Sequence, residues 1–315
     1  MKNKFLITGA TGFIGSNLVK RLVKKNIDII AIDNNTRGNT ERLKDVLKDI
    51  EFYQIDIRDY NKLLKISKHC KTLIHLAYIN GTDNFYRQPA NILDVAIRGM
   101  LNIFDVCKNN NIPELFVASS SEVFHKPDII PTNEDVPLVI PDINNPRFSY
   151  GGGKILYELM GKHYGKEFLQ RLVMFRPFNV YGLDMGMGHV IPQLIERATK
   201  SNIQDNQINF KIQGDGNQTR AFEYIDDFID GLEIILEKGK DREIYNIGND
   251  EEVTIKELVS KIFKIIKSEI KINIIPSELP QGGADRRCPD ITKLKKIGYI
   301  PKVKLDQGLK KIIKT

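Results

Sequence analysis

Three side chains of this sequence could together carry out acid–base chemistry on an alcohol. Tyr150 and Lys154 are four residues apart, and Ser120 lies 30 residues before the tyrosine. A tyrosine hydroxyl has an ordinary pKa near 10, but a neighbouring ammonium group favours the phenolate and lowers that pKa. Tyr150 could then remove a hydroxyl proton while a hydride leaves the same carbon, and Ser120 could hydrogen bond the same oxygen. Taken alone, the tyrosine–lysine spacing is equally typical of an exposed pair one helical turn apart.

A glycine-rich turn near the N-terminus could bind a dinucleotide, and this cofactor would supply the hydride acceptor that the chemistry needs. Gly9, Gly12 and Gly15 follow a short apolar run and open a helical pattern, with Phe13 and Ile14 between the last two glycines. Glycines at a strand–helix turn allow a pyrophosphate to approach the backbone, and the helix N-terminus offers free N–H groups to it. The spacing differs from the common Gly-x-Gly-x-x-Gly fingerprint, so a turn needed only for packing is the alternative.

An acidic residue after the second predicted strand indicates which dinucleotide binds. Asp33 lies 24 residues after Gly9. A carboxylate at this place accepts hydrogen bonds from ribose hydroxyls and repels a 2′-phosphate, which favours NAD over NADP. Arg37 is close in sequence and could weaken this preference. Asp56 follows the third strand and could contact the adenine, and a helix cap is a nearly equal alternative for it. The other residues expected to contact the cofactor are Asn34, Ile57, Leu76, Ala77 and Pro177, together with Tyr150 and Lys154.

The elements that must position these residues alternate between strands and helices. The pattern predicts strands at 4–8, 27–33, 51–55, 72–76, 115–119 and 171–176, and helices at 15–25, 92–108 and 150–164. Nearly continuous apolar strands separated by helices indicate a parallel sheet that is covered on both faces. We therefore predict an α/β fold with a Rossmann-type, doubly wound parallel sheet.

The pattern changes after about residue 181 and predicts a smaller C-terminal α/β lobe. Residues 190–200 and 253–267 have helical patterns, and 210–220 and 270–275 read as strands. We expect residues 1–180 to form the NAD-binding domain, with a segment around 221–248 returning to it. Residues 181–315 would mainly form a substrate lobe over the carboxyl edge of the sheet, where open α/β sheets bind ligands.

Composition excludes several other classes of protein. The chain has 315 residues, 41% hydrophobic and 28% charged, which is ordinary for a soluble globular protein. Its 3 cysteines lack a C-x-x-C spacing, so we expect a reducing cytoplasm and no metal site. The first apolar run is too short for a signal peptide or a membrane span. The net charge of +7 comes from scattered lysines, which favours a solvated surface over a nucleic-acid site.

Across nearly its whole length, the chain resembles the extended short-chain dehydrogenases/reductases, and specifically the NAD-dependent nucleotide-sugar epimerases and dehydratases. The matching stretches are TGATGFIG from Thr8, HLA from His75, SSSEVF from Ser119, the Tyr150/Lys154 pair, RPFNVYG from Arg176, GDGNQTRAFEYIDD from Gly214 and RRCPDI from Arg286. The resemblance implies an enzyme of carbohydrate biosynthesis with Ser120, Tyr150 and Lys154 as catalytic residues and NAD as cofactor. It also implies a homodimer that pairs the helices at 92–108 and 150–164.

The resemblance further implies a nucleoside-diphosphate sugar as substrate. Asn179 would approach the phosphate or the sugar, and Val190 would lie beside the nucleotide. Arg220 and Arg287 would bind the diphosphate, although a surface salt bridge is the alternative for either arginine. Tyr78 would reach into the sugar pocket, and Ser121 would contact the substrate beside Ser120.

Departures from the family pattern narrow the reaction. Ser121-Glu122 stands where the dehydratases carry Asp-Glu, which disfavours 4,6-dehydration and is similar to the UDP-glucuronate decarboxylases. Glu122 could move a second proton. Gly153 fills a position that is often serine, Ala96 one that is often asparagine, and Tyr78 one that is often small.

These observations predict oxidation at sugar C4 to a 4-keto species, with 4-epimerisation as the net result. A net C4 dehydrogenase or a decarboxylase acting on a GDP- or UDP-sugar is the alternative. Gln213, in place of an aromatic residue that often precedes the GDG stretch, hints at guanine. A non-catalytic NAD-binding or redox-sensing protein of the same fold is the alternative from another class.

Overall fold

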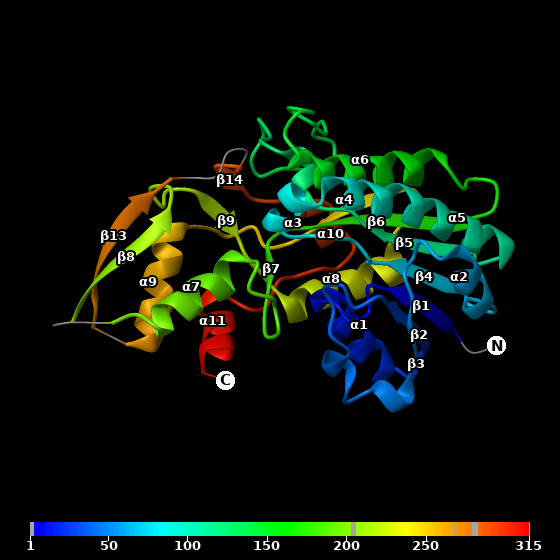
Figure 1. Ribbon diagram of the computed structural model, residues 1–315, viewed down its shortest axis with the longest axis horizontal. Coiled ribbons are helices and arrows are strands. Elements are labelled where there is room, and N and C mark those ends of the chain that lie inside the picture. Colours follow the sequence, from blue (N-terminus) through cyan, green and yellow to red (C-terminus); the bar gives the residue numbers. More distant parts are fainter. Residues whose placement is uncertain (1–2, 203–205, 268, 279–282, 315) are drawn as a thin grey trace.

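The computed structural model describes residues 3–202, 206–267, 269–278 and 283–314, and its centre is a parallel sheet of seven strands (Figure 1). The strand order is β11-β6-β5-β4-β1-β2-β3. The strands are β1 (Lys4–Thr8), β2 (Asp28–Asp33), β3 (Glu51–Gln54), β4 (Thr72–His75), β5 (Glu114–Ala118), β6 (Arg171–Pro177) and β11 (Ile244–Ile247). This order and the parallel pairing confirm the predicted Rossmann-type sheet.

Helices cover both faces of the sheet, as its apolar strands require (Figure 1). One face carries α4 (Pro89–Asp94), α5 (Met100–Asn109) and α6 (Phe148–His163), with α2 (Tyr60–Ile66) packed against α5. The other carries α1 (Phe13–Val23) and α8 (Ile225–Lys238). The helix predicted at 92–108 is formed by α4 and α5, which a π-helical segment at Val95–Gly99 joins. The remaining predicted ends differ from the observed ones by one or two residues, except at 210–220.

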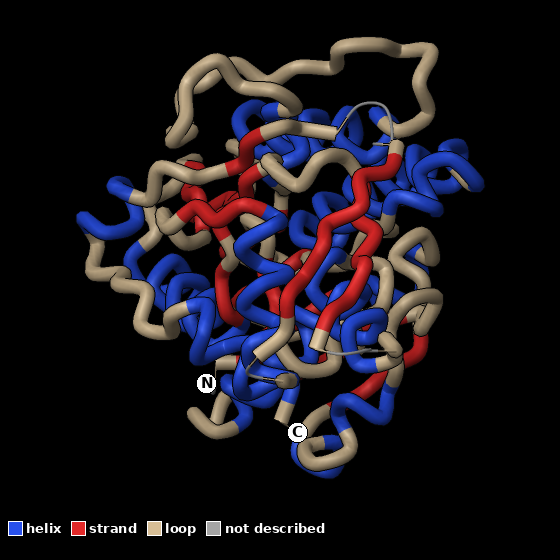
Figure 2. The backbone as a smooth tube through the Cα atoms, turned by 90° about the vertical axis from the view of Figure 1, so that its left-hand side faces the viewer, coloured by secondary structure: helices blue, strands red, loops and turns tan. Residues whose placement is uncertain are grey.

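A smaller lobe lies at one end of the sheet, and Figure 2 turns it toward the viewer. Its helices are α7 (Val190–Thr199), α9 (Ile255–Ile266) and α11 (Leu305–Ile313). Its strands pair as β8 (Gln207–Gln213) with β13 (Lys271–Ser277), β9 (Thr219–Ala221) with β12 (Glu252–Thr254) and β14 (Arg286–Arg287), and β7 (Val180–Tyr181) with β10 (Glu223–Tyr224). Two short helices, α3 (Thr82–Arg87) and α10 (Thr292–Lys296), complete the described elements named here.

The single strand expected at 210–220 is wrong, because the chain turns between β8 and β9. Gly214 and Gly216 have φ angles of +68° and +81°, in the left-handed region that glycine adopts without strain. The turn lets β8 pair with β13 while β9 pairs with β12 and β14. In α9, the capping box expected from Thr254 and Glu257 is present.

A buried ion pair fixes α6 to the sheet. The guanidinium of Arg176 on β6 donates to both carboxylate oxygens of Glu158 on α6, with Nε–Oε1 and Nη2–Oε2 distances of 2.8 and 2.6 Å. Ser119 donates its hydroxyl to the same carboxylate. Their side chains are only 2% and 4% exposed, so neither charge has water as an alternative partner. Because α6 also carries Tyr150 and Lys154, this pair helps to set the distance between these two residues and the strand ends.

We predict that Arg176→Met lowers the free energy of unfolding by roughly 3–5 kcal/mol, because it leaves the carboxylate of Glu158 buried without its cation. Thermal or urea denaturation measures the change. Removing the exposed partner of Glu196 by Lys200→Met should cost less than about 1 kcal/mol. If Arg176→Met proved as mild as this control, the buried pair would not anchor α6.

Candidate active site

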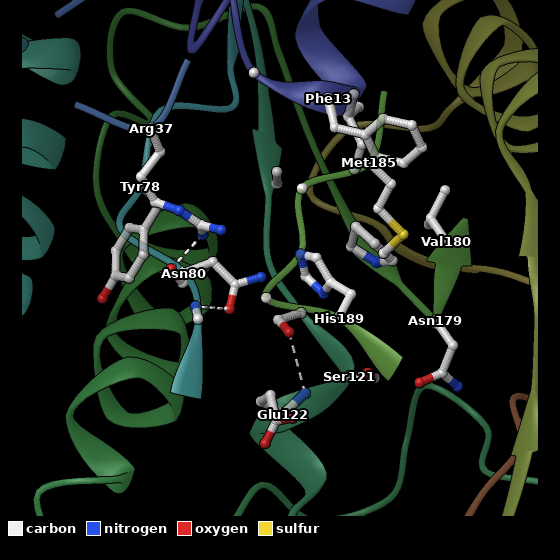
Figure 3. A pocket seen from close by; sticks show the side chains of 18 of the residues that line it. Phe13, Arg37, Tyr78, Asn80, Ser121, Glu122, Asn179, Val180, Met185 and His189 are labelled. Atoms are coloured by element: carbon white, nitrogen blue, oxygen red, sulfur yellow. Dashed lines mark hydrogen bonds between the residues drawn. The ribbon is translucent and has the colours of Figure 1, made fainter. Parts of the chain in front are cut away.

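A cavity of about 380 Å³ lies where the β1–α1 turn, the end of β5 and the start of α6 meet (Figure 3). The predicted residues that line it are Gly9, Gly12, Phe13, Ile14, Gly15, Leu76, Tyr78, Ser120, Ser121, Glu122, Tyr150, Lys154, Pro177, Asn179, Val190 and Arg287. The glycine turn and the Ser–Tyr–Lys group, far apart in sequence, therefore face the same space. The described residues contain no group of three or more His, Cys, Asp or Glu that could hold a metal ion.

A second cavity of about 110 Å³ continues from the first over the β2 and β3 strand ends. Its predicted residues are Asp33, Asn34, Asp56, Ile57 and Ala77. The carboxylate of Asp33 accepts from the backbone N–H groups of Thr11 and Asn35, at 3.1 and 2.8 Å. Asp56 binds Arg58, which lowers the pKa of its carboxyl to about 2. Two joined cavities with a glycine turn at their junction fit the two halves of a dinucleotide.

The glycine turn is needed both for packing and for the cavity. Gly9 has φ +72°, and a β-carbon there would lie 2.7 Å from the backbone nitrogen of Ala77. A β-carbon on Gly15 would overlap the carbonyl oxygen of Gly9. The turn closes with a hydrogen bond of 3.1 Å from the N–H of Gly12 to the carbonyl of Gly9. The packing reading and the cofactor reading of this motif are therefore compatible.

Burial dominates the acidity of the Tyr150 phenol. It raises the pKa of Tyr150 to about 12, and a hydrogen bond with Ser120 offsets part of this shift. The phenol ring stacks on Phe85 at 4.9 Å between centroids. The ammonium of Lys154 is 6.0 Å from the centre of the Tyr150 ring. The sequence predicted that Lys154 lowers the pKa of Tyr150. In the structure this pKa is raised, because loss of water outweighs the surrounding positive charges.

Lys154 is the second buried ionisable group of the site. Its ammonium donates to the carbonyl of Ala118 at 2.6 Å and lies 4.2 and 4.6 Å from the ring centres of Tyr78 and Tyr157. Burial lowers the pKa of Lys154 to about 7, and the charge of Glu158 opposes the shift. Near neutral pH, a small change in local charge can therefore move a proton on or off this amine.

Tyr78 fills a space that only a glycine on α6 leaves open. A β-carbon on Gly153 would overlap the hydroxyl of Tyr78 and lie 2.9 Å from the β-carbon of Ala96. The Tyr78 ring meets that of Tyr150 edge-on, with 5.1 Å between centroids. Its hydroxyl is buried and has no hydrogen-bond partner among the residues that the structure describes. The three departures at positions 78, 96 and 153 therefore depend on one another in packing. Together they place the Tyr78 ring against Tyr150 and Lys154.

Glu122 is held as a carboxylate by arginines. Burial disfavours its charge, but Arg287 and Arg147 outweigh this effect and lower the pKa of Glu122. The Nη1–Oε1 distance to Arg287 is 2.6 Å, and the Nη2–Oε2 distance to Arg147 is 3.9 Å. Arg147 was not anticipated, since it lies in a segment without a recognisable motif. An ionised Glu122 can accept a proton but has none to donate.

The other predicted substrate residues are divided between the cavity and its surroundings. Asn179 and Val190 line the cavity with Arg287. Arg220 is not among the described residues that line it; its guanidinium donates to the carbonyls of Thr219, Ala284 and Asp285. Its binding of a diphosphate stays a prediction.

His189, just before α7, is a cavity residue that sequence reasoning missed (Figure 3). Burial, followed by the charge of Arg37, lowers the pKa of His189 to about 4, so the imidazole is neutral at pH 7. Its position next to Val190 was the available signal.

Comparison with known proteins places this geometry among related sequences. The chain matches the model of the "NAD dependent epimerase/dehydratase family" over residues 5–248. It is 31% identical to a UDP-N-acetyl-alpha-D-glucosaminuronate decarboxylase of Bacillus cytotoxicus, over 99% of this chain and 97% of that protein. It is 32% identical to a putative UDP-glucose 4-epimerase of Methanocaldococcus jannaschii, over 98% and 96%. A solved structure of a UDP-N-acetylglucosamine 4-epimerase from Methanobrevibacter ruminantium M1, in complex with UDP-N-acetylmuramic acid, superposes with a TM-score of 0.87 at 26% identity, covering 100% and 98%.

We predict that Lys154→Met stabilises the folded protein by roughly 1–3 kcal/mol near neutral pH, since each unit of lowered pKa costs more than about 1 kcal/mol. Because the pKa of Lys154 is lower in the folded state, its penalty is fully present below about pH 7 and disappears toward the unfolded value of 10.5. The gain should therefore shrink as pH rises through this window. Urea denaturation at several pH values measures it.

Lys264→Met, at an exposed position of α9, controls for the general effect of exchanging a helical lysine for methionine. A Lys154→Met variant whose stability difference from the parent did not change between pH 7 and 10 would contradict the lowered pKa.

We also predict that Gly153→Ala lowers stability by roughly 1–3 kcal/mol, because the new methyl group meets the Tyr78 hydroxyl. Adding Tyr78→Phe should recover part of this loss by removing that hydroxyl. Gly152→Ala is the matched control, since its methyl group would meet only the side-chain tip of Ile140, at 3.3 Å. Melting temperatures of the single and double variants test the coupling, and equal losses from Gly153→Ala with and without Tyr78→Phe would refute it.

Proposed function

The chain belongs to the NAD-dependent epimerase/dehydratase family, and we propose that it inverts C4 of a nucleoside-diphosphate sugar through a 4-keto species. The enzyme class and the NAD cofactor predicted from the motifs are confirmed by this membership. The observation that carries the proposal is one cavity that brings the glycine turn to Ser120, Tyr150 and Lys154. Bound NAD would supply a hydride acceptor for the sugar carbon and, once reduced, a hydride donor.

The groups that would contact NAD and the C4 oxygen of the sugar have defined tasks in this proposal. Gly9, Gly12 and Asp33 would hold the dinucleotide, and Lys154 would lie beside it. Tyr150 removes the proton of the C4 hydroxyl and later returns it to the same oxygen. Ser120, already bonded to the phenol, holds this oxygen in place. A pKa near 12 means that Tyr150 stays protonated until positive charge enters the cavity, so bases are not generated before the ligands bind.

The diphosphate of the substrate fits the cationic end of the same cavity. Arg287 lines it beside Asn179 and Val190. An arginine recognises phosphate oxygens through paired N–H donors. The relatives named above are described as acting on, or binding, UDP-sugars, which supports a uridine nucleotide; a GDP-sugar is the other candidate.

Decarboxylation is the second candidate, and the Glu122–Arg287 pair favours it. Their contact of 2.6 Å lies in the cavity that holds Tyr150. A uronate carboxylate could take the place of Glu122 on Arg287, which would leave Glu122 with Arg147 at 3.9 Å. The 31% identity to a UDP-sugar acid decarboxylase also supports this reading. Net C4 dehydrogenation would use the same Ser–Tyr–Lys group without the return step.

We further propose a homodimer in the cytoplasm. Leu93, Ile97 and Leu101 are 40%, 45% and 38% exposed at four-residue intervals along α4 and α5, and Leu159 on α6 is 55% exposed. Apolar side chains at this spacing form a stripe that a second copy could cover. Cys70, Cys107 and Cys288 are free and buried, which suits a reducing compartment.

We predict that Tyr150→Phe lowers turnover by about 100- to 10,000-fold while NAD stays bound, because only the proton acceptor is removed. Incubation with UDP- and GDP-sugars, followed by NMR of the products, measures turnover; bound NAD is counted after denaturation. An inverted C4 centre supports epimerisation, whereas carbon dioxide release or accumulated bound NADH assigns one of the alternatives. Full turnover by Tyr150→Phe would remove the proposed mechanism in every form.

A further inference from the structure

The side chain of Arg37 lies where the two cavities join. Both cavities are lined by Gly9, Gly12, Arg37, Leu76 and Tyr78. On one side of this junction lies the cavity that contains Asp33, and on the other side lies the cavity that contains Ser120, Tyr150 and Lys154. In Figure 3 the guanidinium reaches toward Asn80 and into the space between the labelled side chains. Any molecule that occupies both cavities has to pass this group.

One hydrogen bond to the backbone places the guanidinium at the junction, near two glycines. Its Nη1 donates to the carbonyl of Asn80. A β-carbon built on Gly81 would lie 3.7 Å from Nη1, and one built on Gly188 would lie 3.9 Å from Nη2. The side chain thus extends from the loop after β2 to the loop after β4 and to the loop before α7.

The charge of Arg37 has no counterpart within the described protein. The titratable groups that act on it are Tyr150, which is neutral at pH 7, and Arg42, which repels it; burial is the largest effect and lowers the pKa of Arg37. No carboxylate among residues 3–202, 206–267, 269–278 and 283–314 forms an ion pair with it. Arg37 is exposed to the two cavities that it lines, and an anionic ligand there would give its charge the partner that the described residues do not supply.

We infer that Arg37 binds the pyrophosphate of NAD and does not select for or against a 2′-phosphate. The pyrophosphate is the part of the cofactor that joins its two nucleoside halves, as the junction joins the two cavities. The pyrophosphate carries two negative charges and could be the anionic partner that the guanidinium does not have. A glycine turn of this kind, which lies at the same junction, usually binds the pyrophosphate of a dinucleotide. The carboxylate that would face a 2′-phosphate belongs to Asp33, which accepts from Thr11 and Asn35 and not from Arg37.

This assignment changes the meaning of Arg37 relative to the expectation from sequence. Proximity to Asp33 along the chain suggested a residue that tolerates NADP. The observed contact with Asn80 and the absence of an ion pair with Asp33 among the described residues indicate a residue that tightens the binding of NAD in either redox state. An enzyme that must keep the reduced cofactor between two half-reactions benefits from such a contact. The inference depends on NAD binding and not on which sugar is converted.

The test is the binding of ligands that contain different parts of NAD. Calorimetric titration of protein freed of dinucleotide compares adenosine, ADP-ribose, NAD and NADP for the parent, Arg37→Met and Arg37→Lys. We expect Arg37→Met to weaken ADP-ribose and NAD about 10- to 100-fold, since a charge-assisted hydrogen bond is lost at each contact. Adenosine should bind within about twofold of the parent, and the ratio of NAD to NADP affinity should stay unchanged. The affinity of Arg37→Lys for ADP-ribose and NAD should lie between the affinities of the parent and of Arg37→Met.

Three outcomes would overturn the inference. The first is unchanged binding of ADP-ribose by Arg37→Met. The second is an equal loss for adenosine, which would indicate a structural role. The third is a change confined to NADP, which would assign the 2′-phosphate. Arg197→Met, an exposed position on α7, controls for the loss of one positive charge. Because no sugar enters the experiment, its failure would leave the proposed epimerisation untouched, and a failed epimerase assay would leave this inference untouched.

Discussion

The cost of removing ionisable groups from water is the constraint on which this active site depends. Tyr150 and Lys154 lie on one turn of α6 and both face a cavity in which burial opposes their charged forms. It raises the pKa of the phenol to about 12 and lowers that of the amine to about 7. Near neutral pH the phenol is therefore protonated and the amine is about half protonated, so charge brought by a ligand can shift both. In a cavity of this kind, Tyr150 would not ionise until the cofactor is bound, and the proposed catalysis would then depend on that cofactor.

The packing around α6 follows from the same constraint, because a helix that carries buried polar groups must be held firmly. The Arg176–Glu158 pair fixes it to β6, and Ser119 completes the carboxylate's bonds, which leaves Ser120 free to face the cavity. On the opposite side, the Tyr78 ring lies below the ammonium of Lys154, in a space that Gly153 leaves open. Both the Arg176–Glu158 ion pair and the contact between Lys154 and the Tyr78 ring are buried away from water.

Much of this arrangement was predictable from the sequence, and the reasons for the exceptions are physical. Apolar periodicity located the strands, and parallel strands that end at one edge bring distant motifs together, so the glycine turn, Asp33 and the Ser–Tyr–Lys group were found. The break at Gly214 was missed because its positive φ is a property of the turn and not of the apolar pattern. The partners of long side chains were also beyond the sequence: Arg37 donates to the carbonyl of Asn80, and Arg287 reaches a carboxylate 165 positions away along the chain.

The ionisation of one phenol tests this account most directly. Absorbance of the phenolate, taken as the difference between the parent and Tyr150→Phe, can be followed against pH with and without saturating NAD. We predict a midpoint near pH 12 for the protein alone and a midpoint at least about one unit lower when the positively charged nicotinamide is bound. A midpoint that is the same in both titrations would contradict the claim that the cofactor's charge switches the buried phenol on.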